Sequence, residues 1–228
     1  MTVQLQTAQT YVRSLLDEPN TQFWSQAELA NWINEGCADA ARRVEWKRTT
    51  AFVATTALTQ TYVMPTDVYR IYRCEWVPNP NTGQVTYTVE FRGYMEMDQI
   101  WGINQQWPAS YPLYYTLWKV PPAMNMIIYP VPSQAGTLNV YYYQQITPAV
   151  APTDPIDALE GWEDVIYDYA AYRALRKDAD PRWQEFKATY EDKLTAQLNA
   201  TRTFQDQAGT FTTGQAALPA WLVSDGLY

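Results

Sequence analysis

Apolar residues recur at helical spacing near both ends of the chain and at shorter spacing in the middle. Leu5, Ala8, Val12 and Leu15 lie three or four positions apart, so they predict a helix over residues 2–16 with one apolar face.

A second helix is predicted to begin at Ser25 and to end near residues 46–48. Ser25 is followed three residues later by Glu28, the spacing of a capping box, in which the two side chains cap each other's backbone amides. The apolar face of this helix consists of Leu29, Trp32, Ile33, Cys37, Ala40 and Val44.

Two further helices are predicted over residues 161–177 and 181–203. Asp180 is a suitable N-cap for the second of these, and Pro181 suits its first turn. An apolar stripe along it consists of Trp183, Phe186, Tyr190, Leu194 and Leu198.

Between residues 49 and 145 the pattern is typical of short strands, because Thr, Val, Tyr and Phe dominate and Pro and Gly stand at the breaks. A short helix is also predicted over Glu96–Ile100. The predicted strands are Ala51–Ala57, Thr61–Met64, Tyr69–Val77, Val85–Arg92, Leu113–Val120, Met124–Tyr129 and Leu138–Gln144.

These elements predict an α+β fold in four segments. An N-terminal helix pair (1–48) and a C-terminal helix pair (151–203) complete one helical bundle, because neither pair could bury its apolar stripe alone. An antiparallel β-sandwich or barrel-like domain (49–150) is inserted between them, and residues 204–228 form an extended C-terminal arm.

Two long stretches carry almost no charge. Residues 99–153 contain Lys119 as their one charged residue, and residues 203–224 contain Asp206 alone. Both are rich in Tyr, Trp or Pro and are interrupted too often by polar residues to cross a membrane. Because interface cores are depleted in charge and enriched in aromatics, these stretches predict surfaces covered by other protein chains.

The composition excludes several classes of site. The net charge is −8, which argues against tight binding of nucleic acid through phosphate neutralisation. The chain has no His, which removes Ser-His-Asp and Cys-His catalysis and His-ligated metals, and no Gly-rich phosphate loop occurs. Cys37 and Cys74 lack metal or redox spacing. We therefore expect a protein that is not an enzyme and has no cofactor or metal.

Several short motifs occur in an order that is similar to a known family. Near the N-terminus these are RSLLDEP (13–19), FWSQAEL (23–29) and WINEG (32–36); further on they are YVMPTD (62–67) before Arg70, IIYPVP (127–132) before LNVYY (138–142), and a helix beginning near Trp162. Over residues 10–200 this order resembles the head-to-tail adaptor (connector) proteins of tailed bacteriophages.

The resemblance implies a structural protein of the virion neck, made in the host cytoplasm and not bound to a membrane. Its partners would be copies of itself in a ring, typically a dodecamer, the portal protein above, tail or nozzle proteins below, and double-stranded DNA that passes through without specific binding. Two alternatives stay open: a carbohydrate-binding or glycosidase-like virion module, and a tail-tube or tail-terminator protein.

Three groups of residues are candidate sites. Phe211, Leu218, Trp221 and Leu222 are apolar anchors on the arm and are expected to dock on the portal or a neighbouring subunit. Trp101, Trp107 and Tyr111 lie in a long aromatic loop that is expected to contact the tail.

The third group is acidic: Asp154, Asp157, Glu160, Glu163 and Asp164, followed by Asp168. Acids at this position can be a solvated linker that favours a helix N-terminus, they can line the channel and repel DNA or bind an ion, or they can act in catalysis. Glu28, Glu35 and Asp39 are further channel candidates.

The tyrosine-rich strands also allow more than one reading. Tyr141, Tyr142 and Tyr143 are consecutive, so their rings must lie on both faces of one strand. Rings that face away from the core can form a subunit or tail interface, or a platform that stacks on sugars.

Overall fold

The computed structural model describes residues 3–18, 23–78, 85–101, 108–120 and 123–212. The chain divides into two compact units. Residues 1–40 and 148–228 form one, called here the helical unit, and residues 41–147 form the other, called here the β unit.

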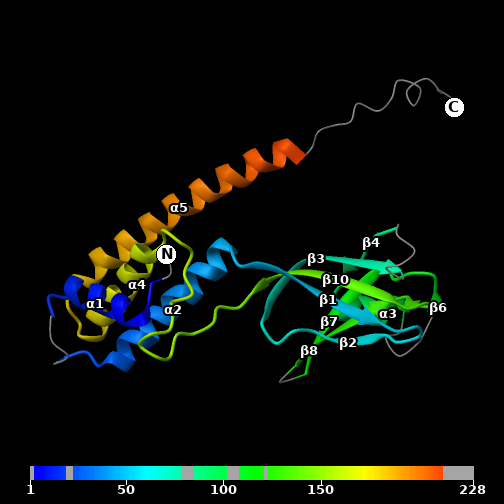
Figure 1. The fold of residues 1–228 in the computed structure, drawn as a ribbon, viewed down its shortest axis with the longest axis horizontal. Helices are drawn as coiled ribbons and strands as arrows, with labels where there is room; N and C mark the ends of the chain where they lie inside the picture. The colour runs from blue at the N-terminus through cyan, green and yellow to red at the C-terminus, as the bar shows by residue number, and fades with distance from the viewer. Residues whose placement is uncertain (1–2, 19–22, 79–84, 102–107, 121–122, 213–228) are drawn as a thin grey trace. The chain divides into compact units, whose positions relative to one another are not determined.

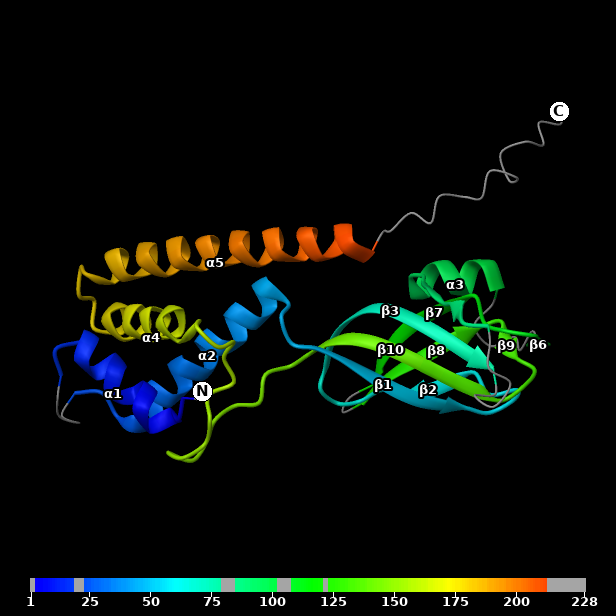
Figure 2. The same cartoon turned by 45° about the horizontal axis from the view of Figure 1, so that its top comes forward.

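The helical unit contains helices from both ends of the sequence (Figure 1). They are α1 (Leu5–Leu15), α2 (Gln26–Val44, whose last turn belongs to the β unit), α4 (Glu163–Lys177) and α5 (Trp183–Thr212). Figure 2 shows α4 running alongside α5, and α1 also packs against α4. The predicted apolar stripes are buried in their central parts, with Val12, Leu29, Ile33, Tyr190 and Leu194 at most 1 % exposed. Leu15 is 38 % exposed, and Trp183, Phe186 and Leu198 are half-buried.

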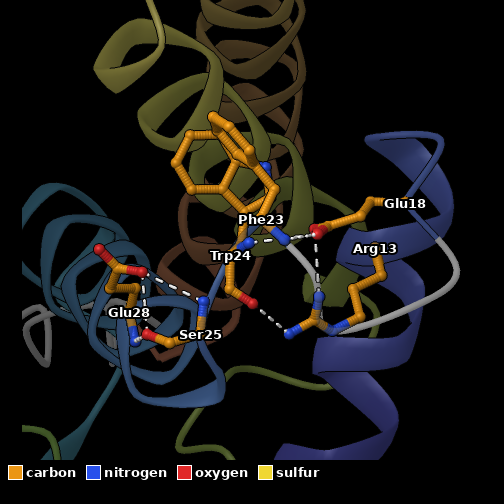
Figure 3. A network of polar contacts seen from close by, with 6 residues as sticks. All are labelled: Arg13, Glu18, Phe23, Trp24, Ser25 and Glu28. Atoms are coloured by element: carbon orange, nitrogen blue, oxygen red, sulfur yellow. Dashed lines mark hydrogen bonds and ion pairs between the residues drawn. The ribbon is translucent and has the colours of Figure 1, made fainter.

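The connection from α1 to α2 is held by Arg13 and Glu18 (Figure 3). The guanidinium of Arg13 is buried, donates to Glu18 Oε2 at 3.1 Å and donates to the carbonyl oxygen of Trp24 at 2.6 Å. Glu18 Oε1 in turn accepts the backbone N–H groups of Phe23 and Trp24. This network explains the RSLLDEP motif, because its Arg and Glu fix the turn that follows the helix.

The capping box at the start of α2 is confirmed. The backbone N–H of Glu28 donates to Ser25 Oγ at 3.2 Å, and the backbone N–H of Ser25 donates to Glu28 Oε2 at 3.1 Å (Figure 3). Asp180 lies just before α5, which begins two residues later than predicted, and its Oδ1 accepts the backbone N–H of Arg182 in the turn that leads into the helix, at 2.9 Å.

The β unit contains two four-stranded sheets and one short strand pair among the described residues. The first sheet has the order β1 (Arg48–Thr55), β10 (Gly136–Gln144), β3 (Val68–Pro78), β4 (Tyr87–Thr88). The second has the order β2 (Thr61–Val63), β8 (Ala123–Tyr129), β7 (Tyr114–Val120), β5 (Glu90–Phe91). The short pair is β6 (Pro108–Ala109) with β9 (Val131–Pro132).

One predicted strand is divided between the two sheets. The sequence predicts a single strand over Val85–Arg92, but the chain changes sheets at Val89. The Val89 N–H donates to Cys74 O of β3, whereas the Glu90 N–H donates to Leu113 O beside β7. As a result β5 pairs with β7 in parallel, as β6 does with β9, so the expectation of purely antiparallel pairing is wrong at these two pairs.

Both sheets contribute to one hydrophobic core. Trp76 of β3 is fully buried at its centre and donates from Nε1 to Thr55 Oγ1 at 3.0 Å. Gly136 of β10 is required beside it, because a Cβ there would lie 2.5 Å from Val77 O and 2.7 Å from the Trp76 ring. The other core members are Tyr62, Met64, Val68, Cys74, Val89, Tyr115, Met126, Ile128, Leu138, Val140 and Tyr142.

Helix α3 (Tyr94–Trp101) extends the predicted short helix by two residues at its N-terminal end and one at its C-terminal end. Met97 of α3 is 1 % exposed and packs with Ile127 and Tyr129 of β8, whose neighbours in the strand face the core. Helix α3 therefore covers the outer face of the second sheet.

The predicted start of the C-terminal arm is wrong by nine residues. Helix α5 continues to Thr212, so residues 204–212 are helical where an extended chain was expected. The physical reason is the absence of proline between Pro181 and Pro219, since a single glycine costs a helix only about 1 kcal/mol.

Candidate assembly surfaces

The predicted acidic group lies along the connector that precedes α4 and in the first turn of that helix. Asp154 Oδ2 accepts the backbone N–H groups of Val150 and Ala151 at 3.0 and 2.7 Å, and these hydrogen bonds lower the pKa of Asp154. Its carboxylate therefore holds a turn of its own connector. Glu163 and Asp164 lie in the first turn of α4, where negative charge favours the helix dipole.

Exposure separates the remaining acids of this group. Glu160 and Asp164 are exposed and Asp157 is half-buried. Asp168 is 5 % exposed, and Lys193 Nζ of α5 lies 2.6 Å from its Oδ2. Burial raises the pKa of Asp168, and the Lys193 charge partly opposes that shift. Asp168 is thus part of the packing between α4 and α5.

The three further channel candidates each have a partner inside the helical unit. Glu28 forms an ion pair with Lys177, and Glu35 forms one with Arg173 at 3.0 Å. Asp39 accepts a hydrogen bond from the hydroxyl of Tyr190. These carboxylates therefore connect α2 to α4 and α5.

The structure describes the predicted tail-contacting loop and the predicted arm in part. Trp101 is the last residue of α3, Trp107 lies outside the described residues, and Tyr111 is half-buried. The Tyr111 ring stacks on that of Tyr87, with centroids 3.9 Å apart and an interplanar angle of 13°. Phe211 lies in the last turn of α5, whereas Leu218, Trp221 and Leu222 lie outside the described residues.

The outward rings that the sequence predicts on one strand are part of a larger surface on the first sheet, called here the Tyr–Arg face, whose arginines were not predicted. Tyr142 is buried in the core, and Tyr141 and Tyr143 lie on the opposite face of β10, as their alternation requires. Three arginines and a third tyrosine join these two rings. The Tyr–Arg face consists of Arg48 of β1, Arg70, Tyr72 and Arg73 of β3, and Tyr141 and Tyr143 of β10. Tyr143 is only 8 % exposed, so the arginines and Tyr72 supply most of the accessible surface.

Two register shifts in β3 create this face. Tyr141 of β10 pairs with Arg73 of β3, and the next residue, Tyr142, pairs with Ile71, so Tyr72 of β3 has no partner position in β10. Tyr69 of β3 is skipped in the same way. Such bulges re-aim side chains. They accommodate the repeat Tyr69-Arg70-Ile71-Tyr72-Arg73, whose period of three does not fit a regular strand. The repeat was the signal in the sequence that could have revealed this face.

Cations and rings alternate across the Tyr–Arg face. The guanidinium carbon of Arg70 lies 5.2 Å from the Tyr143 ring centroid, and that of Arg73 lies 5.6 Å from that of Tyr141. The Tyr72 and Tyr143 rings are 4.9 Å apart. Arg70 also forms an ion pair with Glu45 at 2.7 Å, and Arg73 forms one with Glu75. These contacts hold the face in one arrangement before any partner binds.

A groove of about 550 Å³ lies between β3 and the edge formed by β5 and β7. Glu90 is the one carboxylate among its lining residues in the described part of the chain. Glycoside hydrolysis needs two carboxyl groups across the bond that is cleaved. The groove therefore lacks the pair that a glycosidase-like site would require.

Two other kinds of site are also absent from the described residues. They contain no group of three or more Cys, Asp or Glu side chains placed to hold a metal ion. None of the described helices is long and apolar enough to span a membrane.

Comparison with known proteins decides the family. The model of the SU10 adaptor protein family matches residues 3–218. The chain belongs to the SU10 adaptor protein family. The resemblance to head-to-tail adaptors seen in the sequence is therefore confirmed at the level of the family.

A solved structure is also similar to this adaptor, although distantly. It is a chain from the neck of an empty GTA particle computed with C6 symmetry, with 13 % identity over 77 % of this chain and 83 % of that one. The TM-score of 0.28 is too low to support an argument from its fold. No curated protein sequence is similar enough to the chain to count as a relative.

Proposed function

We propose that this adaptor forms a ring of twelve copies in the virion neck. The ring docks under the portal, offers a platform to tail or nozzle proteins, and surrounds the double-stranded DNA as it leaves. The observation that carries this proposal is the family match over residues 3–218. In the ring, the helices of each subunit act as one bundle and the two sheets as one sandwich.

The charge of the helical unit supports its place around DNA. This unit has eighteen Asp and Glu against eight Lys and Arg, a net charge of −10. A negative wall repels phosphate and lets DNA slide without adhering. Glu160 and Asp164 are the acids of the group that best fit this role, because both are exposed, whereas Asp168 is buried between α4 and α5.

The C-terminal arm is proposed to anchor each subunit on the portal or on a neighbouring subunit. Residues 213–228 contain Asp225 as their one charged residue and include the anchors Leu218, Trp221 and Leu222. Such apolar residues on a tether become ordered on a partner. Phe211, at the end of α5, would mark where the anchoring surface begins.

The experiment that tests this function is electron microscopy of the purified chain mixed with the portal protein of the same phage. A ring stacked under the portal and coaxial with its channel is expected. Deletion of residues 213–228 should abolish stacking, whereas replacement of Gln215 alone by Ser should not. If the full chain does not associate with the portal, the adaptor role proposed here is wrong.

A further inference from the structure

The two outer faces of the β unit differ in charge and are both partly apolar. On the first sheet, the Tyr–Arg face presents three arginines. Phe52 of β1 lies on the same side, since it is paired with Asn139, two residues from Tyr141, and it is 73 % exposed. This side of the β unit therefore combines positive charge with exposed aromatic surface.

The outer side of the second sheet has the opposite character. Met95 of α3 is 73 % exposed, and Trp118 of β7 is 43 % exposed and packs on Tyr94 in a tilted arrangement with ring centroids 4.4 Å apart. Three exposed acids belong to the same side of this sheet: Glu96 and Asp98 of α3, and Glu90 of β5, which is paired with Tyr114. This surface, called here the α3 face, consists of Met95, Trp118, Glu90, Arg92, Glu96 and Asp98.

The acids of the α3 face outnumber its bases. Arg92 lies 3.2 Å from Glu96 and 3.5 Å from Glu90, so one cation is shared between two carboxylates. On the Tyr–Arg face, three arginines are opposed by Glu45 and Glu75. Each face thus keeps an excess of one sign, although the whole β unit has eight basic and six acidic residues.

We propose that the Tyr–Arg face of one copy of this chain docks on the α3 face of a second copy. Opposite charges meet around two exposed apolar side chains, Phe52 and Met95, and aromatic and Arg side chains are the types that dominate binding energy at interfaces. Arg has five N–H donors, so Arg70 and Arg73 can keep their internal partners and still bind carboxylates of the second copy.

This contact is heterologous, because it joins two different faces of the same unit. Each copy keeps one face free after pairing, so the contact repeats from copy to copy and forms a closed ring if the rotation closes. The inference rests on the ring proposed above and specifies its lateral contact in the β unit. A two-fold dimer would instead place the same face on both sides of the interface.

Two single substitutions at exposed positions test the contact. Phe52→Glu places an acid opposite the acidic α3 face, and Met95→Arg places a base opposite the Tyr–Arg face. Each substitution is expected to raise the protein concentration at which half of the chains are associated by about tenfold or more, as loss of a central interface residue does. Leu58→Glu is the control, because Leu58 is 57 % exposed in the turn between β1 and β2.

Mixing the two variants gives the sharper result. The Phe52→Glu copy keeps an intact α3 face and the Met95→Arg copy keeps an intact Tyr–Arg face, so association should return in the mixture, measured by sedimentation velocity. A two-fold contact would not be restored in this way. Failure of the mixture to associate would overturn the proposal even if each variant alone is monomeric.

A cross-link supplies a geometric readout that does not depend on the portal. Phe52→Cys and Met95→Cys copies are mixed at high concentration with a bifunctional thiol reagent, and a 52-to-95 dimer is expected. The native cysteines are 1 % exposed and do not compete. A 52-to-52 dimer, or no dimer, overturns the contact.

These outcomes separate the contact from the adaptor role. If the wild-type chain forms a ring on the portal and both variants still do so, the adaptor role stands and the lateral contact is wrong. If the wild-type chain forms no ring but the 52-to-95 dimer is found, the contact stands and the adaptor role is wrong.

Discussion

Lys193 of α5 neutralises the buried carboxylate of Asp168 of α4, with Nζ 2.6 Å from Oδ2. Lys193→Met is expected to lower the free energy of unfolding by about 1–3 kcal/mol, because it leaves a buried acceptor without its cation. Urea denaturation at pH 7 measures this loss. Lys187→Met, at an exposed position of the same helix, is the control, and an equal loss in both variants would contradict the prediction.

The same carboxylate should make stability depend on pH. Burial raises the pKa of Asp168 above its ordinary value of 3.8, so the folded state holds the proton more tightly than the unfolded state. Stability from this group is present below pH 3.8 and is lost as the pH rises through the folded pKa. Asp168→Asn removes this titration. It should therefore gain stability relative to the wild type as the pH rises from about 3.5 to 7.

Periodicity was sufficient to predict that four helices exist in the helical unit, because they are amphipathic, although it did not give the end of α5. The division of Val85–Arg92 between two sheets could not be read in this way. Every residue from Val85 to Phe91 suits a strand, and the change of sheet is decided by Val89, whose side chain enters a core formed by distant segments.

The β3 residues of the Tyr–Arg face were missed for a similar reason. Strand reasoning assumes that alternate residues share a face, whereas the bulges at Tyr69 and Tyr72 break that period in β3. The acidic group was found from composition alone. Its division into exposed acids and acids that hold the fold depends on Lys193 and on the amides of Val150 and Ala151, which only the fold brings close.

Gly136 should tolerate no side chain. A Cβ there would meet a backbone oxygen and the fully buried ring of Trp76 at less than 3 Å, and neither can move without disturbing the pairing of β10 with β3. Gly136→Ala is expected to cost about 1–3 kcal/mol of stability through overpacking. Gly93→Ala is the matched control, because no atom lies within 4 Å of its Cβ. Thermal unfolding of both variants tests the difference.

Cys37 and Cys74 should not react with thiol reagents while the protein is folded. Burial raises the pKa of each thiol to about 12, and the thiolate is the reactive form. Ellman's reagent at pH 8 is expected to detect no thiol in native buffer and both thiols of the chain in urea. Reaction of one thiol in native buffer would show that its part of the core opens.

The ion pair between Glu28 and Lys177 should stabilise the helical unit in a pH-dependent way. Hydrogen bonds from Lys177 and then from Ser25 lower the pKa of Glu28 from 4.5 to about 2. A lowered pKa contributes stability that is present above pH 4.5 and is lost as the pH falls towards 2. Glu28→Gln should therefore be less stable than the wild type at pH 7, and this deficit should shrink below pH 4.5.

A matched control separates this pairing from a general effect of charge at a helix start. Glu185 also lies in the first turn of its helix, so Glu185→Gln removes a similar charge from the dipole of α5. Urea denaturation of both variants across pH 2.5–7 is the measurement. If the two deficits follow the same pH dependence, the dipole alone explains them. A deficit of Glu28→Gln that persists at lower pH assigns the effect to the contacts with Ser25 and Lys177.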